Sequence, residues 1–389
     1  MNRLVAVTIA ALAALACAGE ASRVDEGLET SIDTADGIVH VRNRGTPPPL
    51  TVAPVARIGS AEGDVDAFGR IRSVIADEHG MVYVADNLAH EIRVFDERGQ
   101  HVRTLGRQGA GPGEFGDLYS LAWLGGNVAA MDPRNARIGV VSSEGDWIRG
   151  IQHYPITGPA SLIRLHPLGA NGFYAPVISG GGGGLPFVRF TSNGAADTIR
   201  IPRRPENARQ LGVTCDRPDG GITGIAVPDA PTIAYAFPPA GSTLAVSWTE
   251  EYRIALLDSG GDTLRIVSHQ LGPVPYPDSL WESAMEPYRK LMTDYPGTRC
   301  EPSAPQRPVS RAALRHLAFD ERGRMWVEAA ADRGYRWDLF DEDGRMVGSA
   351  HVPTRSTGVP PYVRNDHLYQ VETDSIGVQY VAVYRITRT

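Results

Sequence analysis

The strongest constraint on this chain is a pattern that returns after 46 residues. In "DEHGMVYVADNLAHEIRVFDERG", Asp86 and Gly99 align with Asp132 and Gly145 of "LGGNVAAMDPRNARIGVVSSEG", each pair 46 residues apart. The pattern returns as "DERGRMWVEAAADRGYRWDLFDEDG" at residues 320–344. Each copy consists of short runs of alternating side chains separated by turn residues, with no helical period between them. A repeat of this length built from antiparallel strands predicts a β-propeller.

Weaker copies fill the rest of the chain, at residues 161–201, 232–267 and 367–386. The last copy is one strand short, and the segment "APVARIG" at residues 53–59 can supply the missing strand. We therefore predict an all-β fold: a six-bladed β-propeller of four-stranded antiparallel blades over residues 51–389. Pairing of the N-terminal strand with the last blade would close the ring and remove the exposed sheet edges.

The acidic residues of the repeat are predicted to hold turns. Asp-x-x-Gly occurs at residues 77–80, 96–99, 320–323 and 341–344. A tight hairpin needs a residue at positive φ, which glycine tolerates, and an aspartate can hydrogen-bond to the turn backbone. These aspartates are therefore interpreted as structural.

The N-terminus predicts export. Arg3 precedes an apolar run at residues 4–16, which is too short to span a bilayer. Small residues before Cys17 resemble a lipoprotein cleavage site, so residues 1–16 are interpreted as a signal peptide and Cys17 as the lipidated residue; ordinary cleavage with an unmodified Cys17 is the alternative. Residues 17–50 are polar and are expected to be a tether, in which the short apolar patch at residues 38–41 could add a small strand. Two cysteines remain, Cys215 and Cys300, and in an oxidising compartment they are expected to form a disulfide.

Two long connections, at residues 202–231 and 270–310, lie between blades three and four and between blades four and five. Both should rise over the same face of the ring. The second contains the helical pattern "DSLWESAMEPYRKLM", with Asp278 as a possible N-cap and Pro287 as a possible kink. This short helical insertion could plug the channel mouth or leave it open. A glycine run at residues 179–184 should be a loop on the same face.

Candidate binding residues lie at this face. Arg72, Arg164, Arg315 and Arg364 come near the starts of the predicted inner strands, with Tyr119 and His316 close by. If these arginines point into the channel, they form a cationic mouth for carboxylate or phosphate groups. Placement on the surface or between blades is the alternative. The sequence has no CxxC or zincin spacing, so we expect neither a metal site nor a cofactor.

The stretches "GMVYVADNLAHEIRVFDERGQHVRTLGRQGAGPGEF" and "MDPRNARIGVV" resemble the NHL-type six-bladed β-propellers, in particular the exported propeller lipoproteins of bacteria. The resemblance covers residues 38–386 and implies a fold and a place in the cell envelope, without a defined activity. Wider relatives include metal-dependent lactonases and lyases, whose metal ligands lie at the channel mouth.

These observations favour a non-enzymatic binding or interaction module at the cell envelope that uses its loop-rich face. A metal-dependent lactonase-like or lyase-like enzyme is the alternative. The net charge of −7 without a basic tract excludes nucleic acid as a partner. We expect a protein or a small anion as ligand at the residues Arg72, Tyr119, Arg164, Arg315 and His316. The protein is expected to be a monomeric outer-membrane lipoprotein that contacts the membrane only through its lipid.

Overall fold

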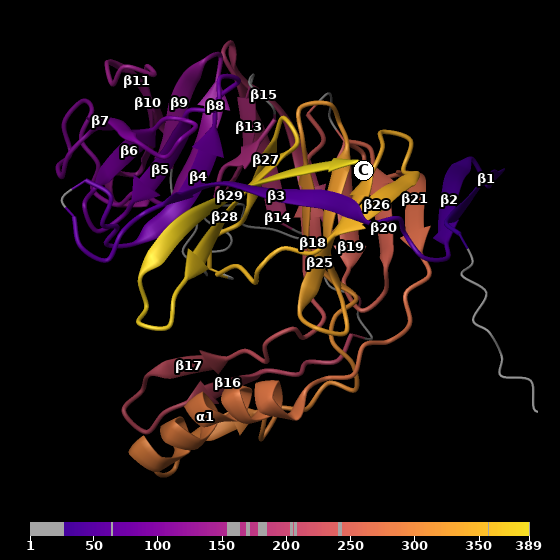
Figure 1. The fold of residues 1–389 in the computed structure, drawn as a ribbon. Helices are drawn as coiled ribbons and strands as arrows, with labels where there is room; N and C mark the ends of the chain where they lie inside the picture. Colours follow the sequence, from indigo (N-terminus) through magenta and orange to yellow (C-terminus); the bar gives the residue numbers. More distant parts are fainter. Residues whose placement is uncertain are drawn as a thin grey trace, which may run out of the picture.

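The structure is a computed structural model in which strands dominate (Figure 1). The residues that it describes are 27–63, 65–153, 164–168, 172–177, 185–202, 205, 208–239, 243–356 and 358–388. The expected signal peptide, Cys17 and the glycine run at 179–184 lie outside this part of the chain. Among the described residues, no helix is long and apolar enough to cross a membrane.

Six antiparallel sheets of four propeller strands each follow one another along the chain, as expected for a six-bladed β-propeller. From the channel outwards, blade one contains β4 (Ile71–Ala76), β5 (Val82–Asp86), β6 (Glu91–Phe95) and β7 (His101–Leu105). Blade two contains β8 (Ser120–Leu124), β9 (Asn127–Asp132), β10 (Arg137–Val141) and β11 (Trp147–Gln152), with the short 3-10 helix η1 (Pro133–Asn135) after β9. Blade three contains β12 (His166–Pro167), β13 (Gly172–Pro176), β14 (Leu185–Thr191) and β15 (Gly194–Ile201).

The second half of the ring repeats this order. Blade four contains β18 (Ile233–Ala236), β19 (Leu244–Trp248), β20 (Arg253–Leu257) and β21 (Thr263–His269). Blade five contains β23 (Leu314–Phe319), β24 (Met325–Ala330), β25 (Tyr335–Phe340) and β26 (Met346–Ala350). Blade six contains β27 (Tyr362–Arg364), β28 (His367–Thr373), β29 (Gln379–Arg388) and, as its outermost strand, β3 (Leu50–Ile58).

The repeated aspartates hold the backbone, as predicted. In the first Asp-x-x-Gly turn, the Asp77 carboxylate accepts hydrogen bonds from the backbone N–H groups of His79 and Met81, both at 2.9 Å. Gly80 has a φ of 82°, a conformation that glycine adopts without steric cost. The same pair of carboxylate bonds recurs in the other three turns, at Asp96, Asp320 and Asp341.

Asp86 and Asp132, the aligned pair of the repeat, tie each blade to the loop that enters it. Both are fully buried. Asp86 accepts the backbone N–H groups of Gly69 and Arg70 at 2.8 and 2.9 Å, just before β4. Asp132 accepts those of Gly116 and Asp117 at 3.0 and 2.9 Å, in the loop that leads to β8. The 46-residue spacing therefore reflects the same aspartate-to-backbone contact in two successive blades.

Apolar side chains from adjacent blades fill the interfaces between them. Between blades one and two, the rings of Tyr83 and Trp123 meet edge to face with their centroids 5.1 Å apart. The Trp123 indole donates a hydrogen bond to the carbonyl of Ala76 at 2.9 Å, so its one polar atom is satisfied inside the interface. Each blade is thus stabilised by its two neighbours.

The ring is closed as the sequence predicts. β3 pairs antiparallel with β29, from Leu50 opposite Arg388 to Ile58 opposite Val381. Strands from the two ends of the folded chain therefore lie in one sheet, and the arrangement leaves β29 with a partner on each side.

The expected tether is folded over much of its length. β1 (Glu29–Ala35) and β2 (Ile38–Arg44) form a hairpin, and β2 pairs in parallel with β21, extending the sheet of blade four to six strands. The buried side chain of Asn43 donates to the Gly344 carbonyl at 3.1 Å and accepts the Met346 N–H at 2.9 Å. The hairpin therefore also connects blade four to blade five.

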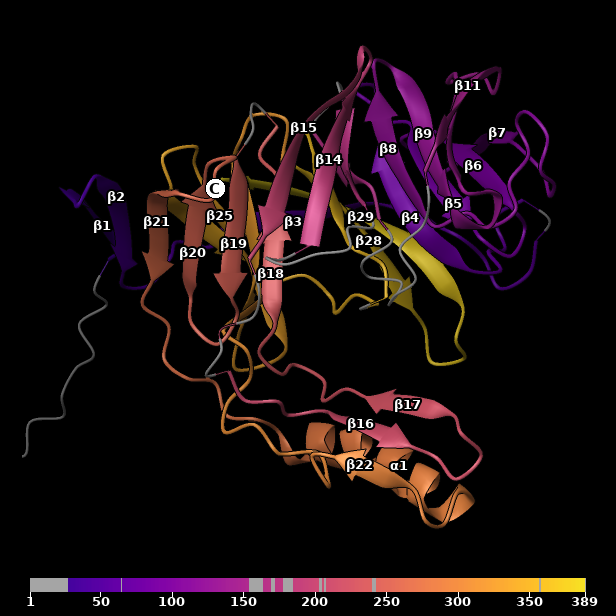
Figure 2. The same ribbon diagram turned by 180° about the vertical axis from the view of Figure 1, so that it is seen from behind.

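The two long connections fold together into one small body outside the ring (Figures 1 and 2). The first contributes β16 (Val213–Asp216) and β17 (Ile222–Ile225), and the second contributes α1 (Asp278–Asp294) and β22 (Arg299–Glu301). The strands form a sheet in the order β17-β16-β22, and the predicted disulfide joins Cys215 to Cys300 across it. Leu291 of α1 packs on Val213 and Ile225. We call this body the insertion subdomain.

The helix agrees with its predicted position but differs in two details. It runs without interruption from Asp278 to Asp294, with Pro287 inside it. Pro277 occupies the N-cap position and Asp278 lies in the first turn, so the helix begins one residue earlier than an N-cap at Asp278 would give. A carboxylate in the first turn still interacts favourably with the helix dipole.

Ring closure generates the first prediction. A chain that begins at residue 60 lacks both the hairpin and β3, whereas a chain that begins at residue 47 lacks only the hairpin. The shorter chain exposes the edge of β29, so its thermal unfolding midpoint should be lower by at least about 10 °C than that of the longer one. Equal midpoints, measured by circular dichroism, would show that the pairing of β3 with β29 does not stabilise the ring.

Candidate functional site

The first strands of all six blades surround a cavity of about 450 Å³ along the axis of the ring. These inner strands run in the same direction, so the residues that begin them meet at one end of the cavity. That end belongs to the face that carries the connections between blades, including the insertion subdomain. None of the described residues that line the cavity comes from α1, so the helix does not plug it.

Four arginines line the cavity at this end. Arg72 is the second residue of β4, Arg164 lies two residues before β12 and Arg315 is the second residue of β23. Arg355 lies in the loop between β26 and β27. The described lining residues include no aspartate or glutamate, so the cavity wall itself is cationic.

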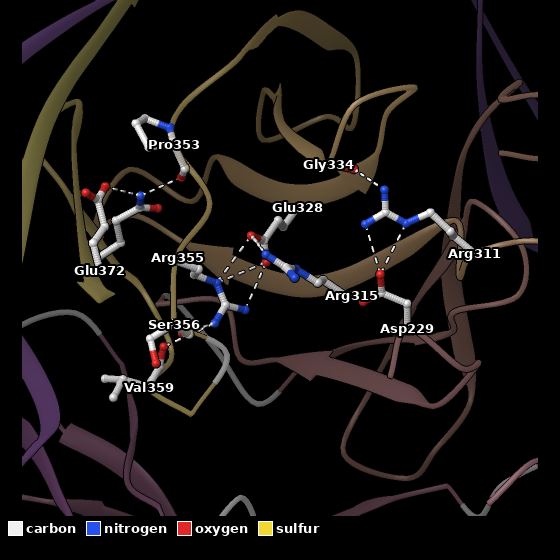
Figure 3. A network of polar contacts seen from close by, with 11 residues as sticks. Asp229, Arg311, Arg315, Glu328, Gly334, Pro353, Arg355, Ser356, Val359 and Glu372 are labelled. Atoms are coloured by element: carbon white, nitrogen blue, oxygen red, sulfur yellow. Dashed lines mark hydrogen bonds and ion pairs between the residues drawn. The ribbon is translucent and has the colours of Figure 1, made fainter. Parts of the chain in front are cut away.

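Two of these arginines share one buried carboxylate, that of Glu328 on β24 (Figure 3). Arg315 donates to Glu328 at 2.7 Å, and Arg355 donates to both of its oxygens at 2.9–3.2 Å. Arg355 also donates to the carbonyls of Ser356 and Val359, which fixes the loop that carries it. Burial opposes ionisation of Glu328, but Arg355 and Arg315 outweigh it and hold the pKa of Glu328 below its ordinary value.

The same network reaches the base of the insertion subdomain. Arg311 donates two hydrogen bonds to Asp229, at 3.1 and 2.9 Å, and a third to the Gly334 carbonyl at 2.9 Å (Figure 3). The ring of Tyr335 lies between Arg311 and Arg315, with guanidinium carbons 4.3 and 3.6 Å from its centroid. Side chains at the ends of both insertions are thus in contact with the cationic end of the cavity.

The other two arginines have no carboxylate partner among the described residues. Arg164 is buried and donates to the carbonyls of Arg72 and Gly358, at 3.2 and 2.6 Å. The guanidinium carbon of Arg72 lies 5.1 Å from the ring centroid of Tyr119, and its buried Nε has no hydrogen-bond partner in the described part of the chain. Burial, with the positive charges of Arg72 and Arg355, lowers the pKa of Arg164 to about 10. This part of the site holds positive charge that a bound anion could compensate.

Farther along the cavity, two histidines are held neutral. Burial lowers the pKa of His166 to about 3, assisted by the charge of Arg164. Burial also lowers the pKa of His316 to about 3, assisted by Arg355. His166 packs among Phe187, Tyr235 and Phe237, with ring centroids 5.1–5.5 Å away. The middle of the cavity therefore carries no charge at neutral pH.

The structure brings together four of the five residues proposed from the sequence. Arg72, Arg164, Arg315 and His316 line one cavity, and Tyr119 contacts it through Arg72. Arg364 is different: it ends β27 instead of starting the inner strand of blade six, it is buried, and it is absent from the cavity wall.

Sequence analysis missed Arg355, Glu328, His166 and Tyr235. Arg355 lies before the inner strand of blade six, in a connection whose sequence has no strand pattern. Its position in a connection between blades could still have indicated that it lies on the face that carries the insertions. Glu328 lies in an otherwise apolar run, "MWVEAAA", where a lone charge indicates a buried partner. Among the described residues, no group of three or more His, Cys, Asp or Glu side chains could hold a metal ion.

Residues 67–123 match the sequence profile of a family described as a 6-bladed beta-propeller. This segment contains blade one and most of the first strand of blade two. No curated protein matches the chain.

Several solved structures share the general shape at low identity. A member of the DUF4221 family from Bacteroides vulgatus is 11% identical with a TM-score of 0.45, covering 94% of this chain and 100% of that one. Virginiamycin B lyase from Staphylococcus aureus is 11% identical with a TM-score of 0.39, covering 87% and 100%. Regucalcin, a calcium-binding protein from Agrobacterium tumefaciens, is 12% identical with a TM-score of 0.38, covering 89% and 97%. These likenesses carry no information on the chemistry of the cavity.

The two partly buried histidines of the cavity generate the second prediction. The pKa of His166 falls from an ordinary 6.5 to about 3 on folding, so between these pH values the unfolded chain binds a proton that the folded chain does not. Its contribution to stability is therefore present above pH 6.5 and is lost progressively towards pH 3. The variant His166→Gln should show a shallower decline of the unfolding midpoint on acidification, by a few degrees at pH 4.5.

The matched control is His79→Gln, because the side chain of His79 is 79% exposed. This control should follow the wild-type curve of unfolding midpoint against pH. A His166→Gln curve parallel to wild type from pH 8 to pH 4.5 would show that His166 is protonated as readily in the folded protein as in the unfolded chain.

Proposed function

We propose that this protein is a non-catalytic binding module that recognises an anionic group at the arginine-lined end of its channel. The observation that supports this proposal is the composition of the cavity wall: four arginines, and no aspartate or glutamate among the described lining residues. A guanidinium fork matches the two oxygens of a carboxylate or phosphate, and a partly dehydrated site strengthens the interaction.

Charge compensation points to Arg72 and Arg164 as the anchoring pair. Glu328 already binds Arg315 and Arg355 and holds them in place. Arg164 is oriented by two backbone carbonyls, which leave its positive charge without a formal counterion among the described residues. A ligand anion placed here would supply that counterion without displacing an existing ion pair.

The alternative from the sequence, a metal-dependent lactonase-like or lyase-like enzyme, has no specific observation in its favour among the described residues.

We further propose that the protein is exported and held at the cell envelope by a lipid on Cys17. The apolar run at residues 4–16 and the small residues before Cys17 support this. The Cys215–Cys300 disulfide is also consistent with an oxidising compartment. The insertion-bearing face would then be available to a partner or a soluble anion.

The anchor generates the third prediction. Replacing Cys17 by Ser should move the protein from the membrane fraction to the soluble fraction, because no lipid can then be attached. Mass spectrometry of the mature N-terminus checks this directly. An unmodified Cys17 in wild-type protein, or unchanged membrane association of Cys17→Ser, would contradict the proposal.

The fourth prediction concerns the anion site. Acetate should raise the thermal unfolding midpoint of the wild type relative to chloride at equal ionic strength, because a ligand that binds only the folded state stabilises it. The variant Arg164→Met should lose most of this shift, and a higher ionic strength should weaken it in the wild type.

Arg385→Met is the matched control, because Arg385 is an exposed arginine on β29, outside the cavity wall. The control should keep the full acetate response. Equal responses of Arg164→Met and wild type would show that acetate acts elsewhere on the protein, and no response in the wild type would count against the anion site itself.

A further inference from the structure

The two ends of the channel differ in chemistry. At the end opposite the arginines, the cavity is lined by Ile75 and Phe319, which come late in β4 and β23, by Phe237, which directly follows β18, and by Val363 of β27. The described wall residues beyond the arginines include no charged side chain at neutral pH, because His166 and His316 are held neutral. The cavity therefore changes from cationic to apolar along its axis.

The apolar part is deep enough to hold part of a ligand. From Arg315 to Phe319, β23 advances four residues, which is about 13 Å at roughly 3.3 Å per residue. The cavity volume of about 450 Å³ lies within the range of small-molecule sites. A small inorganic ion at the arginines would leave most of this space to water against apolar walls.

We infer that the channel binds an amphipathic anion, with its anionic head at Arg72 and Arg164 and its apolar body along the axis towards Phe319 and Val363. This inference rests on the proposed anion site and specifies the class of molecule that occupies it. Transfer of the apolar body out of water favours binding, and the arginines fix the orientation of the anionic head. A ligand charged at both ends is disfavoured, because the described residues that line the far end of this cavity include no charged side chain.

Titration of the purified full-length protein with four probes tests the inference, with the two octyl-chain anions kept below their micellar concentrations and the alcohol below its solubility limit. The probes are octanoate, acetate, 1-octanol and octyl phosphate. Octanoate should bind at least about tenfold more tightly than acetate, because six further carbon atoms are buried. It should also bind at least about tenfold more tightly than 1-octanol, which lacks the charge. Octyl phosphate distinguishes the two head groups: whichever of the two anions binds more tightly identifies the preferred head.

The outcomes separate this inference from the proposed function. Equal affinities for octanoate and acetate would overturn the inference and leave the anion site in place. Equal affinities for octanoate and 1-octanol would overturn it as well, because the head would then contribute nothing. If neither acetate nor octanoate binds, the proposed function itself is wrong.

A pair of variants locates the apolar body. Ala318 lines the cavity near its apolar end and is half-buried. Ala318→Asp should weaken octanoate binding at least about tenfold, because the tail would then lie against a buried carboxylate, and should leave acetate binding within about twofold. Ala318→Asn, of the same size without the charge, should weaken octanoate less. Unchanged octanoate binding to a folded Ala318→Asp variant would show that the tail does not enter the channel.

Discussion

The hydrogen-bonded pairing of β3 with β29 is the interaction on which the rest of the structure depends. Each blade packs on its two neighbours, so an open ring would leave two blade faces and one sheet edge without partners. Residues from the two ends of the folded chain close this gap. The cationic end of the cavity needs the closed ring in particular, because its arginines come from blades one, three and five and from the loop before blade six.

All the cavity arginines except Arg72 are held in place by hydrogen bonds, but a carboxylate among the described residues neutralises only Arg315 and Arg355. Burying a guanidinium costs free energy unless a carboxylate or several hydrogen bonds compensate it. Glu328 provides this compensation for Arg315 and Arg355, whereas Arg164 receives only backbone carbonyls from the described residues. A buried charge without a formal counterion costs stability, which agrees with the binding role that we propose for Arg164.

The sequence predicted the features that depend on local pattern. The blades, their turns, the closing strand, the helix and the disulfide all follow from short-range periodicity or from the pairing of two remaining cysteines. The patch at residues 38–41 indicated a strand, and β2 is found there, but β1 and the position of the hairpin were not predicted. The partner of β2 is β21, more than 200 residues away, and a polar seven-residue strand such as β1 gives no apolar signal. At the site, Arg355 and Glu328 were missed because contacts between a loop and a neighbouring blade leave no regular spacing.

The Cys215–Cys300 disulfide has a topological consequence. The two cysteines are 85 positions apart in the sequence, and the segment between them includes all four strands of blade four, from Ile233 to His269, so this blade is carried on a covalently closed loop. A single proteolytic cut in any hairpin of blade four would therefore leave the polypeptide as one molecule, with both fragments still joined through the insertion subdomain. In an extracellular setting rich in proteases, the propeller could be nicked there without being divided.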